Sequence, residues 1–229
     1  MWSGILEVYC QNLKKRLMVE NIYTVDVQEN PLADIVEIRS ARRPKQVAER
    51  PFDSSLPYIN IQSLELGESE QQYADVSGVE MNEKDLVIVK DGYRSGKVFY
   101  AKEGIAASTL AVLRPKSDDV LATYLYCYLS YCYDDFQKRL KGTTIGHLDM
   151  NYLRQLVIPV PDITIQNEVA EKYQRIKTLT DELRRKALKL KELSIKLSNK
   201  ELKSKCDDLN LQAEMTLKSW LYQIFKKTV

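Results

Sequence analysis

The chain has 229 residues, of which 44% are hydrophobic, so it can form one domain of about 150 residues with its own core and an appendage. No apolar run approaches the roughly 18 residues of a membrane span, and basic residues follow the apolar ones in Met1–Val19, the wrong order for a signal peptide. One histidine and four scattered cysteines argue against a zinc site and indicate reduced thiols, so we expect a cytoplasmic protein without a metal or cofactor.

The formal net charge of +2 is unevenly distributed along the chain. Residues 166–229 hold 15 Lys/Arg and 9 Asp/Glu, a net charge of +6, whereas residues 1–165 hold 19 and 23, a net charge of −4. The N-terminal part is therefore not a general polycation. If it binds nucleic acid, it must do so through local basic patches.

The first half of the chain predicts one helix and several short strands. Apolar residues at helical spacing predict an amphipathic helix at residues 2–18, on the stripe Trp2, Ile5, Leu6, Tyr9, Leu13 and Leu17. A basic, proline-containing loop spans Arg42–Pro57. We predict strands at Ala33–Ile38, Pro57–Leu64, Lys84–Val89 and Val98–Tyr100, and a strand pair in Gly104–Arg114. Short strands that alternate with glycine turns indicate a small, curved β-structure.

A helix is predicted at Asp118–Leu140, with Leu121, Leu125, Tyr128, Leu129 and Cys132 on one face. Its tyrosines are better explained as helix core and rim than as a platform for stacking bases.

The turn Asp91–Lys97 (DGYRSGK) superficially resembles a phosphate-binding loop. It is one residue shorter than the Walker spacing, and Val98 stands where Ser or Thr would hold magnesium. A β-turn that presents Arg94 and Lys97 is the better interpretation. Glycine allows close backbone approach to DNA, and arginine can pair with guanine through two hydrogen bonds.

No catalytic set is recognisable in the sequence. There is no GxSxG motif, no Asn/Asp-Pro-Pro-aromatic methyltransferase pattern, and Ile88 stands where a nuclease would need an acid two residues before Lys90. Three basic clusters lie in or beside predicted loops: Arg39/Arg42/Arg43/Lys45, Lys90/Arg94/Lys97 and Lys138/Arg139/Lys141. Each alone could be solvated surface, but three on one β-rich domain favour a shared nucleic-acid face.

The C-terminal part reads as a helical rod, because neither glycine nor proline occurs after Pro161. Thr164 is the predicted N-cap. A heptad seam follows over about four repeats, at Val169, Tyr173, Ile176, Thr180, Leu183, Ala187, Leu190, Ser194 and Leu197. After Lys205 the pattern breaks, and a last amphipathic helix is predicted on Leu217, Trp220, Leu221, Ile224 and Phe225.

Three segments together resemble the specificity subunit of type I restriction–modification systems. They are Leu56–Leu64 (LPYINIQSL), Lys84–Arg114, and above all Gly142–Gln166 (GTTIGHLDMNYLRQLVIPVPDITIQ). In that family, a Gly-Thr loop, a Leu-rich turn and an Ile-Pro-x-Pro strand lead through Gln into a long helix. Ile165 replaces the usual acid before that Gln, and Asp162 replaces a second Pro.

The resemblance implies an α+β fold: a small β-rich target recognition domain with flanking helices, followed by a long coiled-coil helix. The expected divisions are an N-terminal helix and lead-in (1–30), the recognition domain (31–163), the coiled-coil helix (164–205) and a C-terminal helix (206–229). Family members usually carry two recognition domains and two long helices, whereas one of each is found here. The chain thus looks like a half-subunit.

The resemblance further implies recognition of double-stranded DNA without catalysis, in the major groove of one half of a bipartite site. Methyltransferase subunits that modify adenine, and restriction subunits, would dock on this scaffold. The predicted DNA contacts are Arg42, Arg43, Lys45, Arg94, Ser95, Lys97, Lys141, Thr143, Thr144 and His147.

A half-subunit should work as a homodimer on an inverted repeat. The predicted dimer contacts are Val169, Tyr173, Ile176, Leu183, Ala187, Leu190 and Leu197. At 1.5 Å per residue, a helix over residues 166–203 is about 57 Å long, less than two turns of B-DNA.

Two other functions compete with this interpretation. A coiled-coil adaptor with a β-rich head would bind protein instead, and its head would show no salt-dependent affinity for DNA. A fragment of a fused restriction–methylation enzyme would require catalytic residues from another chain.

Overall fold

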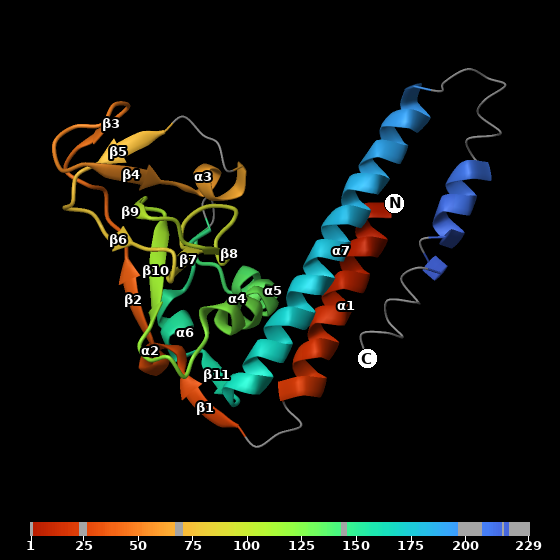
Figure 1. Ribbon diagram of the computed structural model, residues 1–229, viewed down its shortest axis with the longest axis horizontal. Coiled ribbons are helices and arrows are strands. Elements are labelled where there is room, and N and C mark those ends of the chain that lie inside the picture. The colour runs from red at the N-terminus through yellow and green to blue at the C-terminus, as the bar shows by residue number, and fades with distance from the viewer. Residues whose placement is uncertain are drawn as a thin grey trace. The chain divides into compact units, whose positions relative to one another are not determined.

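Figure 1 shows the computed structural model, which describes residues 2–22, 27–66, 71–142, 146–196, 208–216 and 218–219. The chain forms two compact units: Glu20–Ala170, and Met1–Val19 together with Glu171–Val229. The mixture of helices and sheets, with a long helix after a β-rich domain, confirms the predicted fold class. Among the described helices, none combines the length and apolar composition needed to cross a membrane.

A four-stranded antiparallel sheet forms the centre of the larger unit. Its order is β2 (Val36–Ser40), β10 (Leu110–Pro115), β7 (Leu86–Val89) and β8 (Val98–Tyr100). Every residue of β7 is buried, as expected for an apolar central strand. Helix α4 (Ala122–Tyr131) contacts β8, where the rings of Tyr126 and Tyr100 stack with centroids 4.5 Å apart.

A five-stranded sheet contributes the other side of the core (Figure 1). Its order is β3 (Val47–Ala48), β5 (Gln72–Ala74), β4 (Leu56–Ile59), β9 (Gly104–Ala106) and β6 (Glu80–Met81). Only the pairing of β4 with β9 is parallel. One buried cluster contains Val87 and Val112 of the first sheet together with Ile59, Met81 and Ala106 of the second. The hydrophobic core thus joins the two sheets.

Short elements complete this unit. Strand β1 (Gln28–Pro31) pairs with β11 (Val157–Val160), and the Tyr124 hydroxyl donates a 2.5 Å hydrogen bond to the Pro159 carbonyl. The remaining helices are α2 (Leu32–Ile35), α3 (Ile61–Leu66), α5 (Tyr133–Lys138) and α6 (Met150–Gln155).

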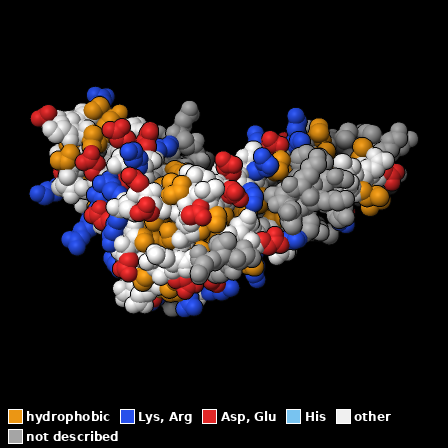
Figure 2. All heavy atoms as spheres, turned by 60° about the horizontal axis from the view of Figure 1, so that its bottom comes forward, with side chains coloured by type: hydrophobic (Ala, Val, Ile, Leu, Met, Phe, Trp, Pro, Cys, Tyr) orange, Lys and Arg blue, Asp and Glu red, His pale blue; other side chains and the backbone are white. Residues whose placement is uncertain are grey.

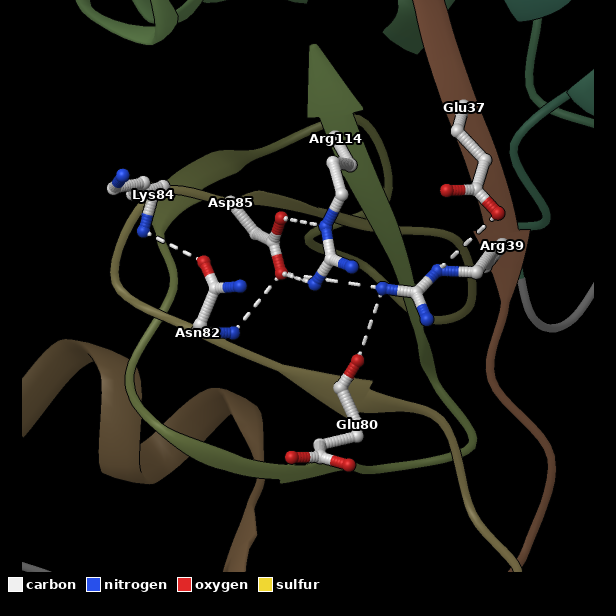
Figure 3. A network of polar contacts seen from close by, with 7 residues as sticks. All are labelled: Glu37, Arg39, Glu80, Asn82, Lys84, Asp85 and Arg114. Atoms are coloured by element: carbon white, nitrogen blue, oxygen red, sulfur yellow. Dashed lines mark hydrogen bonds and ion pairs between the residues drawn. The ribbon is translucent and has the colours of Figure 1, made fainter. Parts of the chain in front are cut away.

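A buried carboxylate ties the sheets together at the start of β7 (Figure 3). The Asp85 side chain has 0% exposure, and Arg114 donates to its two oxygens from Nε and Nη2, each at 2.7 Å. The Asn82 N–H donates a further 2.9 Å hydrogen bond, and Arg39 Nη2 lies 4.0 Å away while donating to the Glu80 carbonyl. Charge-assisted bonds of this kind offset the cost of burying the charge.

The smaller unit contains parts of α1 (Trp2–Ile22) and α7 (Ile163–Lys196), which lie side by side and antiparallel in Figure 1. Lys14 Nζ lies 5.1 Å from the centroid of the Tyr173 ring. Leu13 and Leu17 of α1 are buried, as are Ile176 and Leu183 of α7. The predicted N-terminal helix and the proximal part of the heptad helix therefore both form.

The cap of α7 differs from the prediction. Asp162, not Thr164, accepts hydrogen bonds from the N–H groups of Thr164 and Ile165, at 2.9 and 3.1 Å. A carboxylate one residue before the helix accepts hydrogen bonds from two of its otherwise unpaired N–H groups. Its negative charge also interacts favourably with the positive end of the helix dipole.

Gln166 anchors the first turn of α7 within the larger unit. Its Nε2 donates to the carbonyls of Asp119 and Pro161, and its Oε1 accepts from the Leu121 N–H at 2.9 Å. The glutamine that the family pattern singled out is thus a buried bracing residue.

Three strand predictions need correction. Pro57–Leu64 is not one strand: β4 ends at Ile59 and α3 begins at Ile61, because the Asn60 Oδ1 accepts from the Ser63 N–H at 2.9 Å. Ala33–Ile38 divides into α2 and β2 after Pro31. The two strands in Gly104–Arg114 form, but in different sheets rather than as a pair.

The helix predicted at Asp118–Leu140 is broken into α4 and α5 at Cys132. The predicted last helix is described only at residues 208–216 and 218–219, so its apolar residues Leu217, Trp220, Leu221, Ile224 and Phe225 lie outside the described residues.

Candidate nucleic-acid interface

The topology of the four-stranded sheet brings two of the basic clusters to one end. Strand β2 ends at Ser40 beside Ala111, and β7 ends at Val89 beside Leu110. The chain leaves β2 into the segment Arg42–Lys45, which we name the basic loop. It leaves β7 into the turn Asp91–Lys97, which we name the finger. The points where the chain leaves β2 and β7 are therefore separated only by the start of β10.

The finger is a tight turn whose glycines adopt backbone angles that other residues avoid. Gly92 has φ +106° and Gly96 has φ +88°. A Cβ on Gly96 would lie 2.7 Å from the Cβ of Phe136, so this position also excludes a side chain by contact. The Gly96 N–H donates to the Val89 carbonyl at 2.7 Å, which closes the base of the finger.

A third segment, Lys141–His147, which we name the glycine loop, lies against the finger. The Gly92 N–H donates to the Gly146 carbonyl at 2.9 Å, and His147 Nδ1 lies 2.8 Å from Asp91 Oδ1. Lys141 and His147 exchange backbone hydrogen bonds of 2.9 and 2.7 Å. Thr143 and Thr144, two of the predicted DNA contacts, lie outside the described residues.

Ser95 has a different position from the one predicted. It is fully buried, and its hydroxyl lies 2.7 Å from the Gly92 carbonyl and 2.9 Å from that of Gly146. Gln137 Nε2 also donates to the Ser95 carbonyl at 2.5 Å. Ser95 therefore braces the finger against the glycine loop and α5 and offers no exposed hydroxyl to DNA in this structure.

Lys141 is exposed and is paired within the domain. Its Nζ lies 2.7 Å from the Asp149 carboxylate, which also accepts from the N–H groups of Asn151 and Tyr152 as the cap of α6. The hydrogen bond from Lys141, with those from the two backbone N–H groups, lowers the pKa of Asp149 below its ordinary value.

Arg94 and Lys97 of the finger share one carboxylate that the sequence did not single out. Glu65 of α3 contacts Arg94 Nη1 through Oε2, and Lys97 Nζ lies 2.7 Å from its Oε1. The Glu65 side chain is 15% exposed, against 32% for Arg94 and 46% for Lys97. The anion is therefore the most enclosed member of this group.

Tyr93 is a second residue missing from the predicted set. It is 78% exposed, and the Arg94 guanidinium carbon lies 4.9 Å from the centroid of its ring. The sequence did contain a signal for Tyr93, namely an aromatic residue between two turn glycines. A side chain in such a turn is rarely part of a hydrophobic core.

On the face of the molecule that Figure 2 shows, exposed cations are interspersed with acids. Arg42, Arg43 and Lys45 are all exposed. Figure 2 shows Lys and Arg side chains (blue) alternating with Asp and Glu (red) across the visible face. This agrees with the net negative charge of residues 1–165.

The described residues contain no group of three or more His, Cys, Asp or Glu that could hold a metal ion. Burial, with a contribution from Asp135, raises the pKa of the Cys132 thiol to about 12, so this thiol is neutral and a poor nucleophile near pH 7.

Comparisons with known proteins agree on one family. The family described as "Type I restriction modification DNA specificity domain" matches residues 24–192. The chain is 25% identical over 142 residues to the type I restriction enzyme MjaVIII specificity subunit of Methanocaldococcus jannaschii, which covers 61% of this chain and 33% of that protein.

Solved structures show the same fold. The chain superimposes on the HsdS subunit of Thermoanaerobacter tengcongensis with a TM-score of 0.61 and 17% identity, covering 80% of this chain and 45% of that one. A chain from a study of complex assembly and conformational transition of the type I R-M system gives a TM-score of 0.65 at 15% identity, covering 99% and 53%. The chain thus spans from a third to about half of these relatives.

Proposed function

We propose that this chain, which belongs to the family of type I restriction–modification DNA specificity domains, reads one half of a bipartite DNA sequence as a homodimer. The observation that carries the proposal is the convergence of the finger, the glycine loop and the basic loop at one end of the four-stranded sheet. Turns that present Arg and Lys side chains from a rigid sheet are suited to reading DNA.

The three loops divide the proposed task. Arg94 is the base reader, because its guanidinium is oriented by neighbouring groups on a closed turn. The phosphate contacts are Lys97, Lys141, Arg42, Arg43 and Lys45, since an exposed cation beside the DNA backbone gives affinity that does not depend on sequence. His147, at the edge of the glycine loop, completes the contact surface. Ser95 is not among the proposed direct contacts, because it is buried and braces the finger.

A second copy would supply the reader of the other half-site. Among the described residues, four of the predicted dimer contacts are buried within one chain and so are not open to a partner: Val169, Tyr173, Ile176 and Leu183. Ala187 is half-buried, whereas Leu190 and Leu193 are each 48% exposed. We therefore place the dimer contact at the distal end of α7. Leu197, the last predicted contact, lies outside the described residues.

The length of α7 fits this arrangement. Its 34 residues correspond to about 51 Å, or one and a half turns of B-DNA. A two-fold dimer would read an inverted repeat with a spacer. Methyltransferase and restriction subunits are the partners that would carry out the chemistry, which this chain does not perform itself.

Two measurements test the proposal. Light scattering across a concentration series should give the mass of a dimer, and a strict monomer would contradict the homodimer. Selection from a randomised duplex library with the full chain should enrich an inverted repeat. Equal, salt-dependent binding to all duplexes would contradict sequence recognition, and no binding at all would favour a protein-binding adaptor.

A further inference from the structure

The pairing of Glu65 with Arg94 has a simple geometric basis. Glu65 stands in the last turn of α3, whose start is fixed by Asn60 and whose Ser63 carbonyl accepts a 2.8 Å hydrogen bond from Lys102 Nζ. Ile61 and Leu64 pack against the core cluster between the two sheets. The backbone position of Glu65 is therefore fixed by α3 and the hydrophobic core, independently of the finger.

The carboxylate makes one contact with each of the two cations. Glu65 Oε2 contacts Arg94 Nη1, and Oε1 lies 2.7 Å from Lys97 Nζ. Lys97 Nζ also lies 5.1 Å from the centroid of the Phe99 ring. Each cation is thus held at a defined place in the absence of DNA.

Arg94 is oriented by two neighbours of different kinds. The carboxylate holds one Nη atom, and the Tyr93 ring lies 4.9 Å from the guanidinium carbon. A guanidinium has five N–H donors in a planar fork. Within the described residues Arg94 contacts this carboxylate and this ring, so donors remain for an incoming base.

We infer that Glu65 is a positioning residue that presents Arg94 to a guanine base, so that this half-site contains a G·C pair opposite the finger. A pre-oriented guanidinium can donate to the O6 and N7 of guanine without first losing its rotational freedom. Since Arg94 must read DNA for Glu65 to assist it, this inference rests on the proposed function.

The competing role for Glu65 is that of a decoy for DNA phosphate. A decoy would be displaced by every duplex, so its removal would raise affinity for all sequences by the same factor. A positioning residue acts only where Arg94 meets its base, so its removal changes the preference at one base pair. The low exposure of Glu65 relative to Arg94 and Lys97 favours the positioning role, because the anion is less accessible to solvent than the two cations it holds.

The test compares wild type, Glu65→Gln, Arg94→Ala and the double variant as full chains. Each is selected against a randomised duplex library, and binding is then measured on the enriched site, on that site with each base pair replaced in turn, and on random DNA. Glutamine keeps the shape of Glu65 and removes its charge.

We expect the wild type to enrich a site containing a G·C pair that Arg94→Ala no longer requires. Glu65→Gln should reduce discrimination at that same pair by about tenfold and leave other positions unchanged. In the Arg94→Ala background, Glu65→Gln should have no further effect on discrimination. Glu65→Gln with unchanged discrimination, or with equally tighter binding to all duplexes, would overturn the inference while the proposed function stands.

Failure of the proposed function gives a different result: the wild type itself enriches no site. A melting curve for each variant identifies any that does not fold. If Glu65→Gln does not fold, Glu65→Asp provides the second test. Aspartate keeps the negative charge, but its side chain is one methylene shorter, so it should hold Arg94 less well, and discrimination at the G·C pair should fall while the salt dependence of binding is kept. Unchanged discrimination in Glu65→Asp would overturn the inference.

Discussion

The finger and the basic loop leave the same end of one sheet, yet they are held very differently. In the finger, Ser95 is buried with its hydroxyl on two carbonyls, and Glu65 holds the two cations. In the basic loop, Arg42 and Arg43 are exposed, and Pro44 alone is buried. The comparison teaches that similar basic clusters can be held in different ways: a guanidinium with a fixed orientation is suited to reading a base, whereas an exposed ammonium or guanidinium can contribute charge alone.

The largest expected effect comes from breaking the bracing of the finger. Gly96→Ala places a Cβ 2.7 Å from the Phe136 Cβ at a residue with φ +88°. Backbone strain and overpacking together should lower the free energy of unfolding by about 2–4 kcal/mol. Urea unfolding of wild type and variant measures the difference.

Gly92→Ala is the matched control for this prediction. Gly92 has φ +106°, but a Cβ at this position would meet no atom within 4 Å, so only strain should remain, about 1–2 kcal/mol. Equal losses in the two variants would show that Phe136 moves aside at no cost.

The next effect concerns sequence preference. Arg94→Ala should lose about 1–3 kcal/mol of discrimination between the preferred and the wrong base pair, because a guanidinium that bonds guanine twice is removed. Lys141→Ala should weaken binding to preferred and random duplexes alike, since Lys141 is a phosphate contact in this proposal. Binding titrations on both duplexes at fixed salt measure both effects. Equal behaviour of the two variants would remove the distinction between reader and phosphate contact.

A smaller effect is expected from the basic loop. Arg42→Gln, Arg43→Gln and Lys45→Gln should each reduce the slope of log K against log salt by about one and leave the selected site unchanged. Titrations at several salt concentrations measure the slope. A changed site after any of these substitutions would mean that the basic loop also reads bases.

The smallest effect is a pH dependence at the glycine loop. The pKa of Asp149 is lowered in the folded state, chiefly by Lys141, so its contribution to stability is present above the unfolded pKa of about 4 and is lost as pH falls through the folded pKa. Asp149→Asn keeps a capping side chain but has no charge. Its melting temperature should lie below that of wild type at neutral pH, and the gap should close in acid. A gap independent of pH would contradict this account.

Local patterns in the sequence predicted the elements whose causes are local. The glycine spacing of Asp91–Lys97 indicated the turn, and the apolar spacing beyond Gln166 indicated the long helix. The strand predicted at Pro57–Leu64 extends only to Ile59, because alternating residues can also lead into a helix when Asn60 supplies a cap. The spacing of apolar residues does not reveal such a cap, so helix caps must be looked for separately.

The missing parts of the candidate site depend on tertiary structure. Glu65 meets Arg94 across 29 positions of sequence, and Ser95 is buried by a loop 51 positions away. No spacing rule connects these residues, so charge pattern alone could place Arg94 at the surface without finding the group that orients it. The same limit applies to Ser95: its hydroxyl group suits a contact with DNA, but its buried position makes it a bracing residue.

The architecture of the finger separates what must stay from what can vary. Gly92, Ser95 and Gly96 form the frame, whereas the side chains at 93, 94 and 97 extend from it. The Asp85 network lies at the start of β7, away from this turn, so the scaffold does not depend on these three side chains. A combinatorial library at those positions, with Glu65 included as a fourth, is therefore a compact way to change the DNA preference that we propose for the domain.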